Sequence, residues 1–196
     1  MSDKIKGALD FLRHAERLKD VLRSSHTSQG RTESTAEHTW RLCLMAMTLE
    51  SELGEIDFAR LLKIAVIHDL GEALHGDVPA PDAVHATDKA ARERQDLQTL
   101  LAPLEPEVRQ HFLALWDEYD QLTSREARLV KGLDKLETIL QHNQGRNPAD
   151  FDFAFNLNYG KGYTSAEPLL AAIRQLLDED TQHQVLKQAA QALPRS

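Results

Sequence analysis

The sequence has one cysteine, Cys43, and so no pair from which an internal disulfide could form. It also has only 9 glycines and 7 prolines among 196 residues, and strand-like alternation of apolar and polar residues is hard to find. Leucine and alanine, which favour helices, are common. We therefore expect an all-α fold, in which Cys43 is buried as a small apolar group.

Positive charge and long apolar runs are also scarce. The chain has 23 Lys and Arg against 31 Asp and Glu, a formal net charge of -8. That balance argues against a broad surface for nucleic acids or anionic membranes, so any anionic ligand must be held locally. No apolar run approaches the roughly 18 residues that a membrane span needs, and we recognise no signal peptide. The sequence thus predicts a cytoplasmic protein that binds neither membrane nor nucleic acid.

The length predicts one domain, residues 1–196, with no linker or repeat that would divide it. The first predicted helix has Ile5, Leu9, Leu12 and later apolar residues close to helical spacing. A polar loop, 24–33, follows it, and a looser segment, 146–163, precedes the last helix. The helical spacing of apolar residues, together with the Gly, Pro and capping residues that interrupt it, predicts helices at about 5–23, 34–53, 56–73, 88–102, 107–119, 123–144 and 166–192.

Two of these helices begin with a capping-box pattern. Ser34 is followed three residues later by Glu37, and Thr123 by Glu126. The helix that begins at Ser34 is apolar nearly all round, which is typical of a central buried helix. We expect it to lie in the middle of the fold.

The stretch IAVIHDLGEALHGD, residues 64–77, continues an apolar helix into ionisable residues. The same spacing that places Leu61 and Ala65 in the core places His68, Asp69 and Glu72 on the core-facing side. A buried carboxylate without a partner is costly, so this end of the helix must be wet or must face a cation. His and Asp are both ligands of divalent transition metals. A metal site is one interpretation of these residues, and such a site needs further ligands from other helices.

His38 and Asp134 are the candidates for those ligands, because each is polar where its helix predicts core. His38 precedes Leu42 on one helical face, and Asp134 follows Leu133. Taken alone, either has a simpler explanation: a histidine satisfied within the core, or an aspartate at a solvent edge. Their combination with adjacent His68 and Asp69 favours the metal site.

The pattern H…HD…D on three helices resembles the HD-domain metal-dependent phosphohydrolases. The segments RTESTAEHTW, IHDLGEALHGDVPAP, LWDEY and EARLVKGLDKLETILQ resemble, in order and spacing, the subgroup with bacterial 5'-deoxynucleotidases and the HD domain-containing protein 2 family. The resemblance covers about 17–144 and leaves a C-terminal helical extension at about 165–192. It implies an orthogonal helical bundle with one divalent cation on His38, His68, Asp69 and Asp134.

The resemblance also implies roles for other residues. The family's catalytic carboxylate falls on Glu72 and its second acidic residue on Asp77. The arginine that binds the substrate phosphate falls on Arg23. In the deoxynucleotidases an aromatic residue follows that arginine, whereas this chain has Ser24, so packing against the base or sugar is expected to differ.

These residues suit hydrolysis of a phosphomonoester, a reaction that needs strong charge stabilisation and a ready nucleophile. We expect a metal-activated water to attack phosphorus in line, while Arg23 holds phosphate oxygens and Glu72 orients the water or moves a proton. Asp77 would contact the sugar or assist the leaving group. The expected substrates are (deoxy)nucleoside 5'-monophosphates, and the resemblance implies a homodimer. Mn, Co, Mg, Zn, Fe and Ni cannot be distinguished as the metal.

Two other functions remain open. One is a metal-stabilised regulatory or nucleotide-binding protein with little turnover. The other is a two-metal HD phosphodiesterase or oxygenase, which would need two more histidines between the HD pair and Asp134. His85 and His111 lie in that interval, but neither has a recognisable motif context, so we expect surface or boundary positions for both. The Gly-rich stretch NYGKGY, residues 158–163, predicts a turn, and a loop over the site is the alternative.

Overall fold

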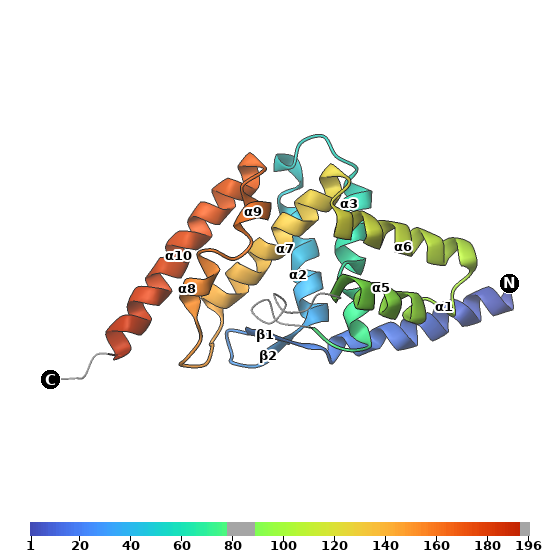
Figure 1. Cartoon of the computed structure of the whole chain (residues 1–196), viewed down its shortest axis with the longest axis horizontal. Helices are drawn as coiled ribbons and strands as arrows, with labels where there is room; N and C mark the ends of the chain where they lie inside the picture. The colour runs from blue at the N-terminus through green and yellow to red at the C-terminus, as the bar shows by residue number, and fades with distance from the viewer. Residues whose placement is uncertain (78–88, 193–196) are drawn as a thin grey trace.

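The structure is a computed structural model that describes residues 1–77 and 89–192, and its central element is helix α7 (Arg125–Gln144). Thirteen of the 20 residues of α7 are buried. It packs against α2 (Thr35–Thr48), α3 (Phe58–Ile67) and α10 (Pro168–Ala192), and Figure 1 shows it between these helices. The all-α class is confirmed, but the central helix is α7 and not the helix that follows Ser34.

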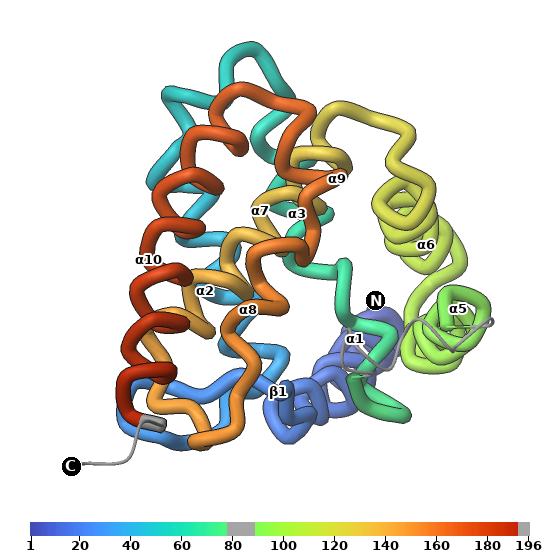
Figure 2. Tube along the Cα trace, turned by 60° about the vertical axis from the view of Figure 1, so that its left-hand side comes forward, coloured from blue at the N-terminus to red at the C-terminus, as the bar shows by residue number. Residues whose placement is uncertain are grey.

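The other elements surround this centre. In Figure 2, α5 and α6 lie on one side of the molecule and α8 and α10 on the other. Their bounds are α1 Ser2–Ala15, η1 Glu16–Lys19, β1 Leu22–His26, β2 Thr32–Ser34, η2 Glu50–Glu52, η3 Leu70–Ala73, α5 Lys89–Leu100, α6 Pro106–Gln121, α8 Phe153–Asn156 and α9 Lys161–Thr164. Among the described residues, no helix combines the length and apolar character that crossing a membrane requires.

The first predicted helix is correct only in its first part. α1 ends at Ala15, and the chain passes through η1 into a strand, so Arg23 lies on β1 and not on a helix. The first part of the predicted apolar stripe faces outward: Ile5, Leu9 and Leu12 are exposed, whereas Leu18, further along the stripe, and Phe11 are buried. Within the part of the chain that the structure describes, these three apolar side chains of α1 thus face outward.

The predicted polar loop 24–33 is largely a β-hairpin. β1 and β2 pair antiparallel, with Leu22 opposite Ser34 and His26 opposite Thr32. Gly30, in the connection, has φ 86, a backbone conformation that glycine adopts readily. The short, polar strands lack the alternation that would have identified them, and the hairpin brings Arg23 to the side of α7.

The capping prediction at Ser34 is confirmed. The Ser34 hydroxyl accepts from the Glu37 N–H, and Glu37 accepts from the Ser34 N–H at 2.9 Å. The prediction that α2 is the central buried helix is wrong, because two of its apolar residues, Trp40 and Met47, are 61% and 55% exposed. Cys43 is half-buried, not buried.

The N-cap of α7 lies one residue later than predicted. α6 ends at Gln121, and its C-cap Leu122 has φ 54 in the left-handed region, so the chain turns before Thr123. Ser124 is then extended and its hydroxyl accepts from the Ala127 N–H at 3.0 Å. The capping-box pattern at Thr123 was therefore misleading.

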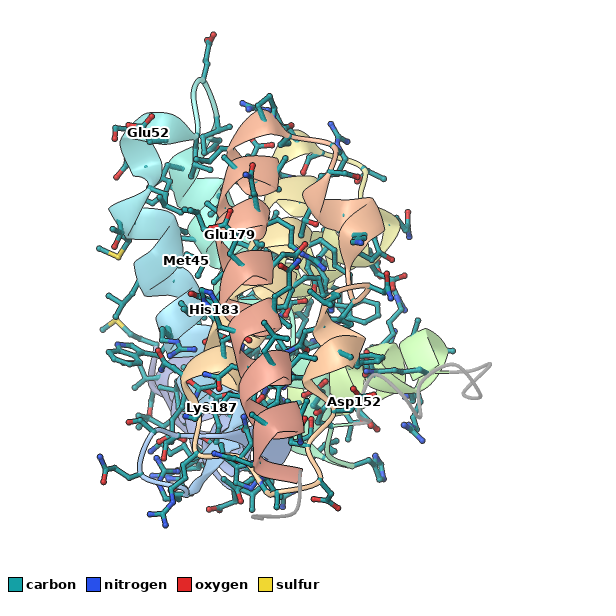
Figure 3. The ribbon with its side chains drawn as sticks, turned by 90° about the vertical axis from the view of Figure 1, so that its left-hand side faces the viewer. Met45, Glu52, Asp152, Glu179, His183 and Lys187 are labelled. Carbon is teal, nitrogen blue, oxygen red and sulfur yellow. The ribbon has the colours of Figure 1, made fainter. Side chains whose placement is uncertain are left out.

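The C-terminal helix is confirmed as α10, and the looser segment before it contains the short helices α8 and α9. Figure 3 shows Glu179, His183 and Lys187 along the outer face of α10. On its inner side, the guanidinium of Arg174 donates to the carbonyl oxygens of Asn156 and Tyr159, at 2.7 and 2.6 Å. These bonds fix α8 and the chain after it between α10 and α7.

Candidate active site

The HD pair lies where α3 stops. α3 ends at Ile67, whereas the apolar period predicted a helix to Ala73, and the chain turns into η3. Gly71 allows this path, since a Cβ there would lie 2.5 Å from the carbonyl oxygen of Glu93 on α5. His68, Asp69 and Glu72 nevertheless border one cavity, as the spacing predicted.

Both histidines of the predicted metal set have one ring nitrogen fixed by the protein. Nδ1 of His68 donates to the carbonyl oxygen of Ala65 at 2.8 Å. Nδ1 of His38 contacts Glu137, whose other oxygen accepts from Nε of Arg41 at 2.6 Å. These partners assign the proton to Nδ1 in each ring and leave Nε2 with its lone pair.

The free nitrogens converge on carboxylates. His68 Nε2 lies 3.0 Å from Asp69 Oδ2, and His38 Nε2 lies 3.2 Å from Asp134 Oδ1. The oxygen of Asp134 on the other side, Oδ2, accepts from the Tyr119 hydroxyl at 3.1 Å and pairs with Lys135 at 2.9 Å. The structure thus brings the four predicted ligands to one place, with Oδ1 of Asp134 facing His38, although Asp134 lies outside the tighter group that His38, His68 and Asp69 form.

This arrangement fits a cation. A potential ligand atom from each of His38, His68 and Asp69 lies within 4.8 Å of the others. His38 Nε2, His68 Nε2 and Asp69 Oδ2 are buried, and none has a hydrogen-bond partner among the described residues. Lone pairs that face one another without a proton between them repel, and a divalent ion would satisfy all three.

The electrostatics of His38 point the same way. Burial and the charge of Arg23 lower its pKa, but Glu137 and Asp134 outweigh both and raise it to about 9. Despite its burial, Asp69 has its pKa lowered by His68 and His38. The carboxylates therefore attract positive charge to the histidine nitrogens, where a proton and a metal ion would compete.

Arg23 reaches the same cavity from β1. Its Nη2 donates to the hydroxyl of Thr138 at 3.0 Å, and its Nη1 lies 3.6 Å from Asp69 Oδ2. On its other side, Nε lies 3.7 Å from Glu33, and only 11% of the side chain is exposed. Although burial opposes its charge, Asp69 and Asp134 raise the pKa of Arg23. A guanidinium held in this way is a permanent cation suited to phosphate oxygens.

Glu72 is the buried carboxyl beside this group and is 5% exposed. It accepts from the hydroxyl of Thr35 at 3.3 Å, and the Lys89 ammonium is 4.0 Å away. Burial, then Asp69 and Asp77, raise the pKa of Glu72 to about 10. Glu72 thus holds a proton near neutral pH, and a cation beside Asp69 would lower that pKa.

The cavity that contains these groups has a volume of about 560 Å³, within the range of small-molecule sites. Arg23, Glu72 and Asp77 line it, as do His68, Asp69 and Asp134. His38 lies behind the cavity wall with 0% exposure. The predicted residues therefore form one site, and its size suits a nucleotide.

The other histidines that the structure describes do not extend the group. His75 pairs with Asp96 at 2.7 Å, and His111 is exposed. His142 is buried and bonds to Asn156 at 2.9 Å. Within residues 1–77 and 89–192, the second possible metal cluster is Glu33, His38 and Glu137, but it shares His38, and Glu137 already pairs with Arg41. His85 lies outside the described residues.

Several site residues were not predicted. Glu137 fixes the His38 ring, Thr138 holds Arg23, and Tyr119 and Lys135 hold Asp134. Glu137 and Thr138 follow Asp134 at helical spacing of three and four, so the polar face of α7 was a signal that could have identified them. Nothing in the sequence places Tyr119 opposite Asp134, because that contact joins two helices.

The comparison with known proteins adds to this geometry. A family model for the HD domain matches residues 15–174. The chain belongs to the HD domain family. The matched range is longer than the one predicted from the sequence motifs, about 17–144, because it continues past residue 144 and includes α8 and α9. The predicted resemblance to HD-domain phosphohydrolases is confirmed.

Relatives of this HD-domain protein include nucleotidases. It is 32% identical over 141 residues to human "5'-deoxynucleotidase HDDC2", which covers 71% of this chain and 68% of the relative. The Dictyostelium discoideum protein of the same name is 34% identical over 141 residues, covering 68% of this chain and 74% of the relative.

The solved structures with similar folds also include phosphohydrolases. A "predicted metal-dependent phosphohydrolase" from Magnetospirillum magnetotacticum matches with a TM-score of 0.76 and 26% identity, over 92% of this chain and 94% of that one. The cyanophage S-2L HD phosphohydrolase DatZ, bound to dA and one catalytic Zn²⁺ ion, matches with a TM-score of 0.55, over 89% of this chain and 96% of that one. At 20% identity, that second likeness shows the fold alone.

Proposed function

We propose that this protein is a metal-dependent phosphohydrolase that removes the phosphate of nucleoside 5'-monophosphates, deoxynucleotides among them. The observation that carries the proposal is a pair of histidine nitrogens, Nε2 of His38 and of His68, that have no hydrogen-bond partner among the described residues. They meet Asp69 beside the buried Arg23, next to a nucleotide-sized cavity. The relatives named 5'-deoxynucleotidase support the choice of substrate.

We propose one divalent cation per chain, held by His38, His68, Asp69 and Asp134. When bound, such an ion supplies charge stabilisation for phosphate oxygens and lowers the pKa of a coordinated water. The ligand types suit several first-row ions, so the metal is left as divalent without a choice among them.

The protein's own groups supply the rest of the reaction. Arg23 binds phosphate oxygens and keeps the phosphorus in place for in-line attack by water. The bond between phosphorus and the 5' oxygen breaks, and that oxygen leaves as the nucleoside hydroxyl after gaining a proton. Glu72 carries a proton at the cavity wall and is the group that exchanges it with water or the leaving oxygen. We assign Asp77, also at the wall, to the sugar.

The alternatives have less support. A regulatory protein without turnover would have no need for Glu72 and Arg23 at the same cavity. A two-metal enzyme would need a second set of ligands, whereas Glu33 and Glu137 are engaged by the cations Arg23 and Arg41.

The proposal is tested by measuring phosphate release from a panel of nucleoside 5'-monophosphates with Mn²⁺, Co²⁺ or Mg²⁺ and with a chelator. We expect turnover of at least one deoxynucleotide with metal and none with chelator. Binding of nucleotides without phosphate release under every metal would favour the regulatory alternative. Metal analysis that gives two ions per chain would favour the two-metal alternative.

We also propose that the protein is a homodimer. The support is the apolar face of α1, where Ile5, Leu9 and Leu12 are 56, 46 and 59% exposed at helical spacing. A second copy would bury this face. Sedimentation equilibrium should give twice the chain mass of 22.1 kDa, and Leu9→Glu should shift the mass toward that of the monomer. A monomeric native protein would contradict the proposal.

The single domain over 1–196 and the cytoplasmic location stay predictions.

A further inference from the structure

The cavity has two ends of different chemistry. Near α5 and α6 its lining is charged, with Lys89 and Glu93 on α5 and Asp120 on α6. At the other end, the chain between α7 and α10 contributes Asp152 and an aromatic wall, which consists of Phe151, Phe155 and Tyr159. A flat, uncharged ring system would lose hydration at the charged end without a matching partner, whereas the aromatic wall offers a π-face.

The rings of the aromatic wall pack against neighbouring rings. The rings of Phe155 and Tyr159 lie 5.4 Å apart at 30°, and that of Phe151 meets His142 edge-on at 4.9 Å. Phe151, Phe155 and Tyr159 are each only half-buried, although they line the cavity. By contrast, Trp116 and Tyr119 at the other end are 3 and 6% exposed and belong to the core. The accessible aromatic surface of the cavity is therefore that of the wall.

The wall is held against α7, the helix that carries the predicted metal ligand Asp134. Gly160 follows Tyr159 with φ 68, and a Cβ there would lie 2.7 Å from the Lys135 side chain, so only glycine lets the chain approach α7 so closely. Lys135 lies 5.2 Å from the centre of the Tyr159 ring and 2.9 Å from Asp134. One side chain thus spans from a predicted metal ligand to the wall.

The wall also has the right position relative to Arg23. Asp134, Thr138 and His142 follow one another at intervals of four residues, about 6 Å each along α7. Thr138 accepts from Arg23, and His142 contacts Phe151. A phosphate between Asp134 and Arg23 would place the remainder of a nucleotide one turn or more along α7, beside the wall.

We infer that Phe155 and Tyr159 are the surface on which the nucleobase stacks, and that they give the enzyme its preference for nucleotides over base-free sugar phosphates. This inference rests on the proposed function. It explains how the site can dispense with an aromatic residue at Ser24, which lines the same cavity. The base-binding surface then comes from the C-terminal part of the fold and not from the hairpin that contains Arg23.

The test compares dAMP with 2-deoxyribose 5-phosphate, which has the same phosphate and sugar but no base. Phe155→Ala should lower kcat/KM for dAMP roughly tenfold, mainly through KM, since stacking contributes about 1.4 kcal/mol or more per base. The value for deoxyribose 5-phosphate should change less than about twofold. The loss should be smaller for dCMP, whose single ring stacks over less area.

Phe153→Ala is the matched control. Phe153 lies on the same short helix and stacks edge-on with Phe151 at 4.9 Å, but it does not line the cavity. Its replacement should leave the ratio of the two substrates unchanged. Phe155→Leu keeps an apolar side chain without the ring, so it should reproduce the loss even if the alanine variant folds poorly.

The outcomes separate this inference from the proposed function. Equal losses for both substrates in the Phe155 variants, or no loss for dAMP, would overturn the stacking surface. A native enzyme that hydrolyses deoxyribose 5-phosphate as well as dAMP would overturn it too, and would leave the phosphohydrolase intact. A native protein that hydrolyses neither substrate with metal present would contradict the proposed function itself.

Discussion

Replacement of Asp69 by alanine is expected to lower phosphatase activity at least about a thousandfold and to remove bound metal. Asp69 contributes the carboxylate between His68 and His38 and also faces Arg23 at 3.6 Å. A metal ion contributes several kcal/mol to a transition state of this kind, and about 4 kcal/mol corresponds to a thousandfold in rate. Phosphate release and metal content per chain are the measurements.

The same variant should lose the thermal response to metal. For the native protein, metal at a hundred times its Kd should add about 2.7 kcal/mol to the free energy of unfolding, and a chelator should remove it. Asp96→Asn is the control, because Asp96, like Asp69, is paired with a histidine, His75, but lies outside the cavity. Full activity in the Asp69 variant would refute the metal site.

Glu72→Gln should lower kcat by about a hundred- to ten-thousandfold, the usual contribution of a positioned acid or base. Glutamine keeps the shape of the side chain and can still bond to Thr35, but it cannot transfer a proton. KM and metal content should therefore change little. Steady-state kinetics with dAMP and metal analysis are the measurements, and a variant that keeps metal and full kcat would exclude Glu72 as the proton carrier.

Although Glu72→Gln should lower kcat, it should raise the free energy of unfolding. The pKa of Glu72 is raised in the folded state to about 10, from an ordinary value of 4.5. The folded protein therefore binds a proton that the unfolded chain releases above pH 4.5, so this contribution to stability is complete at low pH and is lost as pH rises toward 10. Without metal, Glu72→Gln should thus have a higher free energy of unfolding than the native protein at pH 8.

Urea unfolding with chelator present measures this difference, which should shrink near pH 5. Asp120→Asn is the matched control, since Asp120 lines the same cavity but is exposed. It should change kcat less than tenfold and leave the pH dependence of stability unaltered. A native protein that is more stable than Glu72→Gln at pH 8 would mean that Glu72 is ionised and compensated in the fold.

The site was more predictable from the sequence than the fold around it. His68 and Asp69 could be predicted because three ionisable groups interrupt an apolar period without changing it, and His38 and Asp134 because each is polar at a core position. The resemblance then predicted Arg23 and Asp77, which line the same cavity. The extent of α3 was predicted wrongly, since apolar spacing cannot indicate that Gly71 must pass close to the backbone of α5.

By itself, the sequence determined the helical class, the capping of α2 at Ser34, and the set of polar residues too costly to bury without a cation. Local spacing and composition are enough for these, because they depend on the helical period and on desolvation. Only the tertiary structure decided that α7 is the central helix, that a hairpin carries Arg23 to it, and that Tyr119 and Lys135 hold Asp134. It also placed Phe155 and Tyr159 at the cavity. These relations join segments far apart in the chain, and packing between elements, which no local pattern encodes, determines them.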